Sequence, residues 1–374
     1  MKQFIYADNA ATTRLDENAF EAMKPYLLAE YGNASQPYSF SRTAKKALNE
    51  SRKNIAECIG ATPEEIYFTS GGTESDNWAI KSSVLTEANR REIITSQIEH
   101  HAILRACEVA EQLGCRVQYL PVDSEGVVSS YALSDCISGD TRLVSVMMAN
   151  NEIGTIQDIA ALVEIAHAHG ALFHTDAVQA VGHIPIDVRE LGVDMLSASA
   201  HKFNGPKGIG FLYVKTGTPL PSYMSGGAQE SGMRAGTENV ASIVGMATAL
   251  RNNVEAMEKT AEHLFELENR LLCLLRERQI PFTRNGSEKH IPGNISLSFD
   301  GKDGEALLHR LDLMGIYVST GAACNSEDTQ VSHVLQAIAL PERLAKGTIR
   351  VSLGKDNTAE DVEKIAVALA KMHG

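Results

Sequence analysis

The chain has 374 residues, with 34 lysines and arginines against 47 aspartates and glutamates, so its formal net charge is −13. The length allows a large core and two domains, and the acidic balance argues against nucleic acid or an anionic membrane as the main partner. Apolar runs are short and Asp8 comes early, so we expect no membrane span, no signal peptide and a cytoplasmic protein.

Strand-like and helix-like segments alternate along the first two-thirds of the chain. The patterns predict helices at about residues 73–89, 101–113 and 157–169, and strands at about 66–69, 92–96, 117–121, 143–148, 171–175, 194–199 and 209–214. Such alternation is typical of an α/β fold, in which helices cover both faces of a mostly parallel sheet.

The last third of the chain has a different pattern. A long amphipathic segment runs from about residue 239 to 278. It is followed by a predicted strand at 291–299 and predicted helices at 304–314 and 359–373. These elements predict a second, smaller α+β domain at the C-terminal end.

Two segments place polar groups at the ends of predicted strands. Residues 65–75 read as a strand, then Gly71 and Gly72, then a helix start whose free amides suit a phosphate. By itself, that turn fits an ordinary capped helix start better than a phosphate site. Further along, a strand ends in Asp176, and Gln179 follows it. In open α/β sheets ligands bind at the carboxyl ends of strands, so both side chains are candidate ligand contacts.

A lysine lies on a tight connection between two predicted core strands. Residues 197–207 read Ser-Ala-Ser-Ala-His-Lys-Phe-Asn-Gly-Pro-Lys, which places Lys202 just before a glycine turn. Shielding from water lowers the pKa of an amine, and such a lysine readily forms an imine with an aldehyde or ketone. A surface lysine on a turn is the alternative interpretation of Lys202 alone.

Together, these three features fit one cofactor, pyridoxal 5′-phosphate. The cofactor needs a lysine for covalent attachment, a carboxylate that keeps its ring nitrogen protonated and a cradle for its phosphate. Lys202, Asp176 and the Gly71–Gly72 turn supply these three groups. The combination is therefore much more specific than any of its parts.

One of the six cysteines differs from the others in its surroundings. Cys324 lies in a run of small and polar residues at 318–330, which predicts an exposed loop. Because a cofactor site is already inferred, we interpret its thiol as a nucleophile. For the others we expect inert packing in helices or beside a strand: Cys58, Cys107, Cys115, Cys136 and Cys273.

At this point the chain resembles the class-V aminotransferase family, and within it the NifS/IscS-like cysteine desulfurases. The resemblance runs nearly end to end. It is carried by residues 6–13 (Tyr-Ala-Asp-Asn-Ala-Ala-Thr-Thr), 32–33 (Gly-Asn), 69–75 (Thr-Ser-Gly-Gly-Thr-Glu-Ser), 99–100 (Glu-His), 150–154 (Asn-Asn-Glu-Ile-Gly), 176–179 (Asp-Ala-Val-Gln), 199–202 (Ser-Ala-His-Lys), 226–230 (Gly-Gly-Ala-Gln-Glu), 234–239 (Arg-Ala-Gly-Thr-Glu-Asn), 322–326 (Ala-Ala-Cys-Asn-Ser) and 349–350 (Ile-Arg).

The resemblance implies the fold of the pyridoxal-phosphate-dependent transferases, which is similar to that of aspartate aminotransferase. A seven-stranded, mostly parallel sheet would form the large cofactor-binding domain at residues 15–255. The small α+β domain would comprise residues 1–14 and 256–374 and would carry the Cys324 loop. A homodimer is also implied.

The resemblance also assigns roles to individual residues. Lys202 would bind the cofactor and move the substrate Cα proton, His100 would stack on the cofactor ring, and Cys324 would accept sulfur. Arg350 and Asn151 would bind the substrate carboxylate. The cofactor contacts would come from Gly72, Thr73, His100, Asn151, Asp176, Gln179, Ser199, His201, Lys202 and, across the dimer interface, Thr237.

The implied reaction is the desulfuration of L-cysteine to L-alanine. Sulfur would pass to Cys324 as a persulfide and then to an iron–sulfur scaffold or another sulfur-acceptor protein. We expect no resident metal, and Cys324 would be the one candidate ligand for a transient iron–sulfur cluster.

Two alternatives remain open at this stage. The first is a selenocysteine lyase or another class-V aminotransferase, in which Cys324 is incidental. The second is a metal-dependent hydrolase, because His174 and Asp176 lie two apart on one predicted strand and so face the same side. The sequence shows no further cluster of ligands to complete such a metal site.

Overall fold

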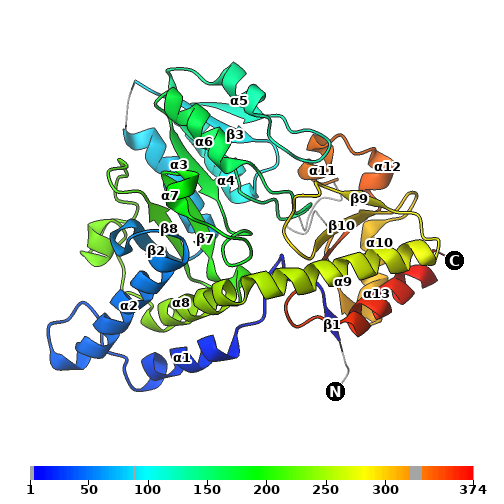
Figure 1. Ribbon diagram of the computed structural model, residues 1–374. Helices are drawn as coiled ribbons and strands as arrows, with labels where there is room; N and C mark the ends of the chain where they lie inside the picture. Colours follow the sequence, from blue (N-terminus) through cyan, green and yellow to red (C-terminus); the bar gives the residue numbers. More distant parts are fainter. Residues whose placement is uncertain (1–3, 87–88, 321–330, 374) are drawn as a thin grey trace.

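The computed structural model describes residues 4–86, 89–320 and 331–373. Within these residues, a seven-stranded sheet forms the centre of the larger part of the molecule (Figure 1). Strand β8 runs antiparallel to both of its neighbours, and the remaining strands run in one direction. In spatial order the strands are β2 (Ile66–Thr69), β8 (Gly210–Val214), β7 (Met195–Ser199), β6 (Leu172–Asp176), β5 (Thr141–Ser145), β3 (Glu92–Ser96) and β4 (Arg116–Leu120). The predicted seven-stranded, mostly parallel sheet is confirmed.

Helices cover both faces of this sheet, as the alternation of elements predicts. Buried side chains of α3 (Gly72–Thr86) and α4 (His101–Gln112) form one core layer. The core on the opposite face receives buried side chains from α1 (Glu17–Leu28), α2 (Arg42–Cys58), α5 (Ser130–Cys136), α6 (Ile159–Ala168), α7 (Val188–Leu191) and α8 (Val240–Glu255).

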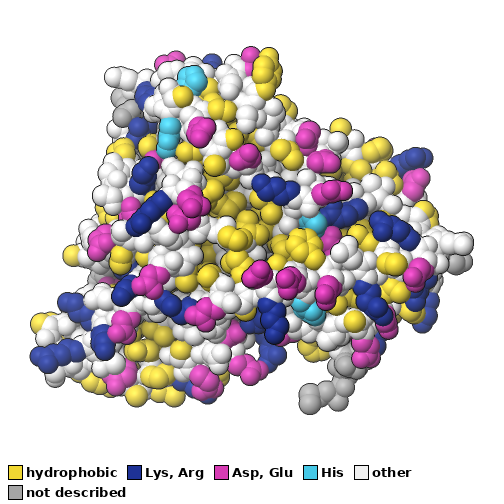
Figure 2. Space-filling model, in the orientation of Figure 1, with side chains coloured by type: hydrophobic (Ala, Val, Ile, Leu, Met, Phe, Trp, Pro, Cys, Tyr) yellow, Lys and Arg dark blue, Asp and Glu magenta, His cyan; other side chains and the backbone are white. Residues whose placement is uncertain are grey.

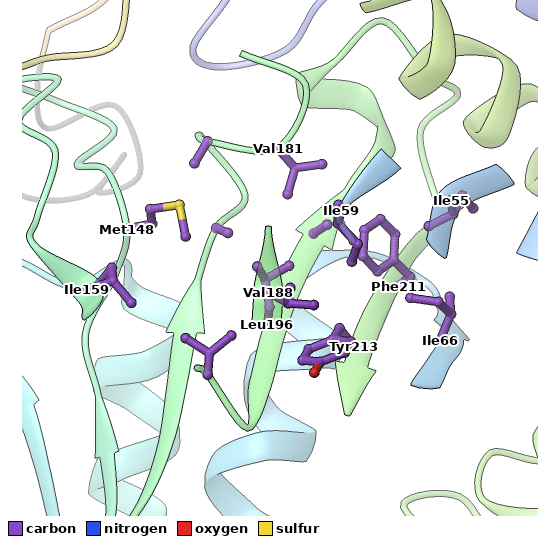
Figure 3. Close-up of a cluster of buried hydrophobic side chains, with 14 of the residues drawn as sticks. Ile55, Ile59, Ile66, Met148, Ile159, Val181, Val188, Leu196, Phe211 and Tyr213 are labelled. Carbon is purple, nitrogen blue, oxygen red and sulfur yellow. The ribbon is translucent and has the colours of Figure 1, made fainter. Parts of the chain in front are cut away.

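Alternating side chains of the central strands feed these two cores. In β8, Phe211 and Tyr213 belong to one core, whereas Leu212 and Val214 belong to the other. This alternation follows from the two-residue period of a strand. Figure 3 shows Phe211 and Tyr213 beside Leu196 of β7. Full burial of one such apolar side chain contributes about 1.5–3 kcal/mol, so the sheet is a rigid support for groups at its edge.

A second core lies around a smaller, three-stranded antiparallel sheet. Its strands are β9 (Thr283–Asn285), β10 (Asn294–Ser298) and β12 (Thr348–Ser352). Helices α9 (Met257–Glu277), α10 (Gly304–Leu313) and α13 (Ala359–Lys371) contribute buried side chains to it. Two short helices, α11 (His333–Ala337) and α12 (Glu342–Ala345), lie beside it in Figure 1.

The N-terminal segment is part of this second core. Strand β1 (Ile5–Tyr6) pairs in parallel with β11 (Ile316–Tyr317), and both Ile5 and Ala7 are buried among the side chains of α9 and α13. Beyond β1, the main chain of Asn9 donates a hydrogen bond to Ser352 O. The domain boundaries at residues 14/15 and 255/256 stay a prediction.

Several local expectations differ from the structure. Helices α1, α2, α5 and α7 are elements that the alternation did not predict. Cys273 was expected to pack inside, but it is exposed on α9, because α9 buries the neighbouring Leu271, Leu272 and Leu275 instead. None of the helices that the structure describes has both the length and the apolar character needed to cross a membrane.

Candidate active site

Nearly all of the predicted site residues meet in one pocket, which has an empty volume of about 970 Å³ including space open to solvent. It lies where β6 and β7 end and α3 begins. The predicted residues that line it are Gly72, Thr73, His100, Asn151, Asp176, Gln179, Ser199, His201, Lys202 and Arg350. Thr237 is exposed and does not line the pocket, and Cys324 lies outside the described residues.

Lys202 is held at the end of a short 3₁₀ turn, η3 (Ala200–Lys202), directly after β7. Its Nζ donates hydrogen bonds to Ala10 O at 2.6 Å and to Ala11 O at 2.8 Å. The main-chain oxygen of Lys202 accepts a hydrogen bond from His183 Nε2 at 2.9 Å. The amine therefore points into the pocket from a connection that is fixed at both its side chain and its backbone.

Asp176 is the last residue of β6 and is almost fully buried. Its Oδ1 accepts a hydrogen bond from the Val178 main-chain amide at 2.9 Å. Burial raises the pKa of Asp176 to about 6, although the Val178 amide and the charge of Lys202 act in the opposite direction. A cation placed against this carboxyl would favour its ionised form.

The start of α3 forms the cradle that the sequence predicted. Gly71 has φ +149°, a conformation that L side chains rarely adopt, and a Cβ on Gly72 would lie 2.5 Å from Val178 Cγ2. Both glycines are therefore required by the backbone and its packing. The free amides and positive end of this 15-residue helix attract an anion, and Ser199 lies next to the same turn.

Two histidines of the pocket are neutral at pH 7. Burial, with the nearby Lys202 charge as a smaller cause, lowers the pKa of His100 and of His201 to about 4. His100 is the N-cap of α4, and its Nδ1 accepts a hydrogen bond from Ala102 N at 3.1 Å. The ring proton of His100 is therefore on Nε2.

Arg350 presents a buried guanidinium from β12. Its two terminal nitrogens donate to Asn151 O at 2.8 Å and to Asp8 Oδ1 at 2.7 Å. Its Nε is buried and has no hydrogen-bond partner within the part of the chain that the structure describes. A planar donor group with a free N–H suits the carboxylate of an amino acid.

Both described ends of the segment around Cys324 are bonded to pocket elements. On one side, Ser319 N donates to Arg350 O at 3.0 Å. On the other side, Ser332 Oγ donates to Glu152 Oε2 at 2.5 Å, and His333 Nε2 donates to Glu99 O at 3.0 Å. The described residues on either side of position 324 are therefore tied to Arg350, Glu152 and Glu99.

Sequence reasoning missed several residues of this pocket. Ala10 and Ala11 contribute backbone carbonyls, which a search for reactive side chains does not find. Asp76 also lines the pocket. Its position one helical turn after Gly72 was a usable signal, because residues four apart lie on the same helix face. Met147 and Val178 complete the lining with apolar surface.

The metal-site alternative is not supported. No group of three or more potential metal ligands occurs among residues 4–86, 89–320 and 331–373. His174 uses its ring nitrogens on two serines instead, at 2.9 Å from Ser145 Oγ and 2.9 Å from Ser197 Oγ. His174, two residues before Asp176 on β6, therefore has a structural role.

Another cavity lies away from these residues and has an empty volume of about 1560 Å³ including open solvent. It runs between residues 182–186 and the helices α8 and α9, and its charged lining residues Glu255, Glu258 and Glu262 are all acids. Figure 2 shows apolar side chains gathered on this face. This larger cavity contains neither Lys202 nor Asp176, so we assign the active site to the smaller pocket, which contains both.

A family model described as aminotransferase class-V matches residues 5–365. The chain belongs to this family. It is 48% identical over 364 residues to a cysteine desulfurase IscS of Dictyoglomus turgidum, covering 97% of this chain and 92% of that one. A cysteine desulfurase IscS of Methanosarcina thermophila is 47% identical, with coverages of 96% and 90%. These relatives place the chain among the cysteine desulfurases of the class-V aminotransferases.

Solved structures agree with this assignment. A NifS-like protein has a TM-score of 0.94 and 38% identity, with 99% of each chain covered. A structure described as SspA in complex with cysteine has a TM-score of 0.84 and 34% identity, and covers 95% of this chain and 100% of that one. The predicted transferase fold is therefore confirmed.

Class-V aminotransferases depend on pyridoxal 5′-phosphate, and the pocket fits this cofactor. The pocket offers the anion-binding start of α3 and the buried carboxyl of Asp176. Lys202 lies in the same pocket with its amine held by two carbonyls. These are the groups that a phosphate, a ring nitrogen and an aldehyde require.

Proposed function

We propose that the protein removes sulfur from L-cysteine, releases L-alanine and passes the sulfur on through a persulfide at Cys324. The observation that carries this proposal is the meeting of Lys202, Asp176, the start of α3 and Arg350 in one pocket. Cofactor attachment and amino-acid binding are thereby possible in the same space. The identity of the substrate is supported by the relatives named cysteine desulfurase.

Bound pyridoxal phosphate would supply an electron sink that weakens the bonds around the substrate Cα and, through it, the Cβ–Sγ bond. The remaining steps fall to residues of the chain. Lys202 Nζ would remove the Cα proton and return it, as general base and then general acid. Arg350 would hold the substrate carboxylate through its free Nε–H, so that this proton faces the amine.

The other pocket residues would hold the cofactor in place. Asp176 would pair with the ring nitrogen, and Gln179 would donate to the ring oxygen. Gln179 already has its amide fixed, because Nε2 donates to Ala10 O at 3.0 Å. His100 would cover the ring face as a neutral imidazole. Gly72, Thr73, Ser199 and His201 would bind the phosphate, and Asn151 would lie at the substrate end.

Cys324 would act on the substrate sulfur as a thiolate. Its Sγ attacks the substrate Sγ, so an S–S bond forms while the Cβ–S bond breaks, and the substrate carbon is protonated to give alanine. The overall change is L-cysteine plus an enzyme thiol to L-alanine plus an enzyme persulfide, which needs no outside oxidant. This role is supported by the hydrogen bonds of Ser319 to the main chain of Arg350 and of Ser332 to Glu152.

We also propose a homodimer and a separate sulfur acceptor. Thr237 is exposed in the single chain, as expected for a residue that serves a partner subunit's phosphate site. Three residues earlier, Arg234 forms an ion pair with Glu74 near the start of α3. The acceptor would be an iron–sulfur scaffold or another sulfur carrier that takes the terminal sulfur from Cys324.

The proposal is tested by incubating the purified, cofactor-loaded protein with L-cysteine and a reductant. We expect L-alanine and sulfide to appear in equal amounts, with a bound chromophore in the visible range. Alanine from L-selenocysteine but not from L-cysteine would favour a selenocysteine lyase. Amino transfer to an added 2-oxo acid without sulfide would favour an aminotransferase.

A further inference from the structure

A second carboxyl lies in the wall of the cofactor pocket and has no role in the proposed reaction so far. Asp76 of α3 is 1% exposed and lines the same pocket as Asp176. Its Oδ1 is buried and has no hydrogen-bond partner among the described residues. Burying an ionised carboxylate without a paired cation costs free energy, so the protonation state of Asp76 affects the stability of the pocket.

The groups that face Asp76 supply no paired cation. On β6, His174 Nε2 is 3.8 Å from Asp76 Oδ1, beyond hydrogen-bond distance, and burial lowers the pKa of His174 to about 3. On β7, Ser197 is a neutral hydrogen-bond partner. Lys202, which follows β7, directs Nζ to Ala10 O and Ala11 O.

The remaining groups are two acids, a thiol, two tyrosines and one arginine that bonds at the far end of α3. Asp176 on β6 and Glu99, just before α4, are the two acids whose charges act on Asp76. Helix α4 carries Cys107, whose pKa is raised to about 12 by burial. On β5, Arg142 donates to Thr86 Oγ1 at the far end of α3. Strands β2 and β8 carry tyrosine as their one titratable residue type.

Two ionised carboxylates cannot share this wall without strong repulsion. Asp176 is the better placed of the two to be ionised, because it accepts the Val178 amide and lies near the Lys202 charge. Burial, followed by repulsion from Asp176, raises the pKa of Asp76 well above its usual value. The arrangement therefore favours one anion and one neutral acid.

Building on the proposed function, we propose that Asp76 is a positioning residue that stays protonated, so that Asp176 is the ionised carboxylate opposite the cofactor's ring nitrogen. Asp76 would complete a neutral hydrogen-bonded line that runs from Ser145 through His174 and Ser197. This wall of the pocket would then carry a single negative charge, on Asp176, opposite the single positive charge of the cofactor's ring nitrogen. A second anion would destabilise the fold without a second cation to balance it.

The first test compares cofactor binding by three variants of the apo-protein at pH 7.5. Asp76→Ala removes the hydrogen-bonding group and is expected to raise the dissociation constant of pyridoxal phosphate by about tenfold. Asp76→Asn keeps the shape and neutrality and should recover most of this loss. Asp135→Asn makes the same substitution at an exposed position of α5 and should match the wild type. If Asp76→Asn is as weak as Asp76→Ala, the negative charge itself is needed and the proposal is wrong.

The second test is the pH dependence of thermal unfolding of the apo-protein. The pKa of Asp76 is raised in the fold, so the folded state binds the extra proton and stability falls as pH rises from about 4 toward that raised pKa. Asp76→Asn has no carboxyl at this position, so its stability should not fall with pH for this reason. The melting temperature of Asp76→Asn minus that of the wild type should increase by at least about 2 °C from pH 5 to pH 9.

An Asp176→Asn background sharpens this test. Removing the neighbouring negative charge lowers the pKa of Asp76, so the gain from Asp76→Asn should shrink there. A gain that does not change with pH, or that is the same in both backgrounds, would overturn the proposal. If the wild-type protein bound no pyridoxal phosphate at all, the proposed function would fail, and the melting experiment would still report on Asp76.

Discussion

Replacing Lys202 with alanine is expected to abolish measurable L-alanine formation from L-cysteine. Lys202 is the lysine that lines the pocket among the described residues, and its Nζ is the group placed to move the Cα proton. Loss of general acid–base catalysis alone costs about 10²–10⁴-fold in rate, and loss of covalent attachment adds to it. The rate is measured with saturating cofactor and a reductant.

Two matched variants separate chemistry from folding. Lys202→Arg keeps a cation for the carbonyls of Ala10 and Ala11 but cannot form the imine, so it should fold and remain inactive. Lys207→Ala removes an exposed lysine five residues away and should keep the wild-type rate. More than a tenth of the wild-type rate in Lys202→Ala would refute the assigned role.

Replacing Cys324 with alanine is expected to leave cofactor binding intact and to stop sulfur transfer to the protein. The substrate sulfur needs a thiolate acceptor, and an alanine at position 324 provides none. Sulfide release under reductant should fall by at least about 10²-fold, as expected when a covalent catalyst is removed. Protein-bound persulfide is measured by mass spectrometry after a single turnover.

The control for this change is another accessible thiol. Cys273 is exposed on α9, and its replacement by alanine should alter neither turnover nor the amount of persulfide. Unchanged alanine formation in Cys324→Ala would show that sulfur leaves without this thiol, as in the lyase or aminotransferase alternatives.

The functional residues at the ends of strands were predictable from the sequence because each follows a recognisable local pattern. The hydrophobic strand 195–199 followed by Lys202, and the strand 172–176 ending in Asp176, needed only short-range periodicity and the rule for parallel sheets. The Gly71–Gly72 turn was predictable because its backbone demands glycine. These three features were enough to infer the cofactor.

Other parts of the site depend on long-range packing and carry no local signal. The carbonyls of Ala10 and Ala11 reach Lys202 across more than 190 positions in sequence, through the pairing of β1 with β11. Asp76 had a usable signal in its place one helical turn after Gly72, but its importance comes from its burial in the same pocket as Asp176. Helix α2 is different, because Ala44, Leu48 and Ile55 recur at helical spacing on its buried face, so this helix was predictable from the sequence.

The most direct test of the central claim is to locate the cofactor on the chain. The loaded protein is reduced with borohydride, digested, and its peptides are analysed by mass spectrometry, because reduction makes an imine to lysine permanent. We predict a single modified peptide, with the pyridoxyl group on Lys202. A modification on another lysine, or a cofactor that is released unreacted after reduction, would contradict the assignment of this pocket.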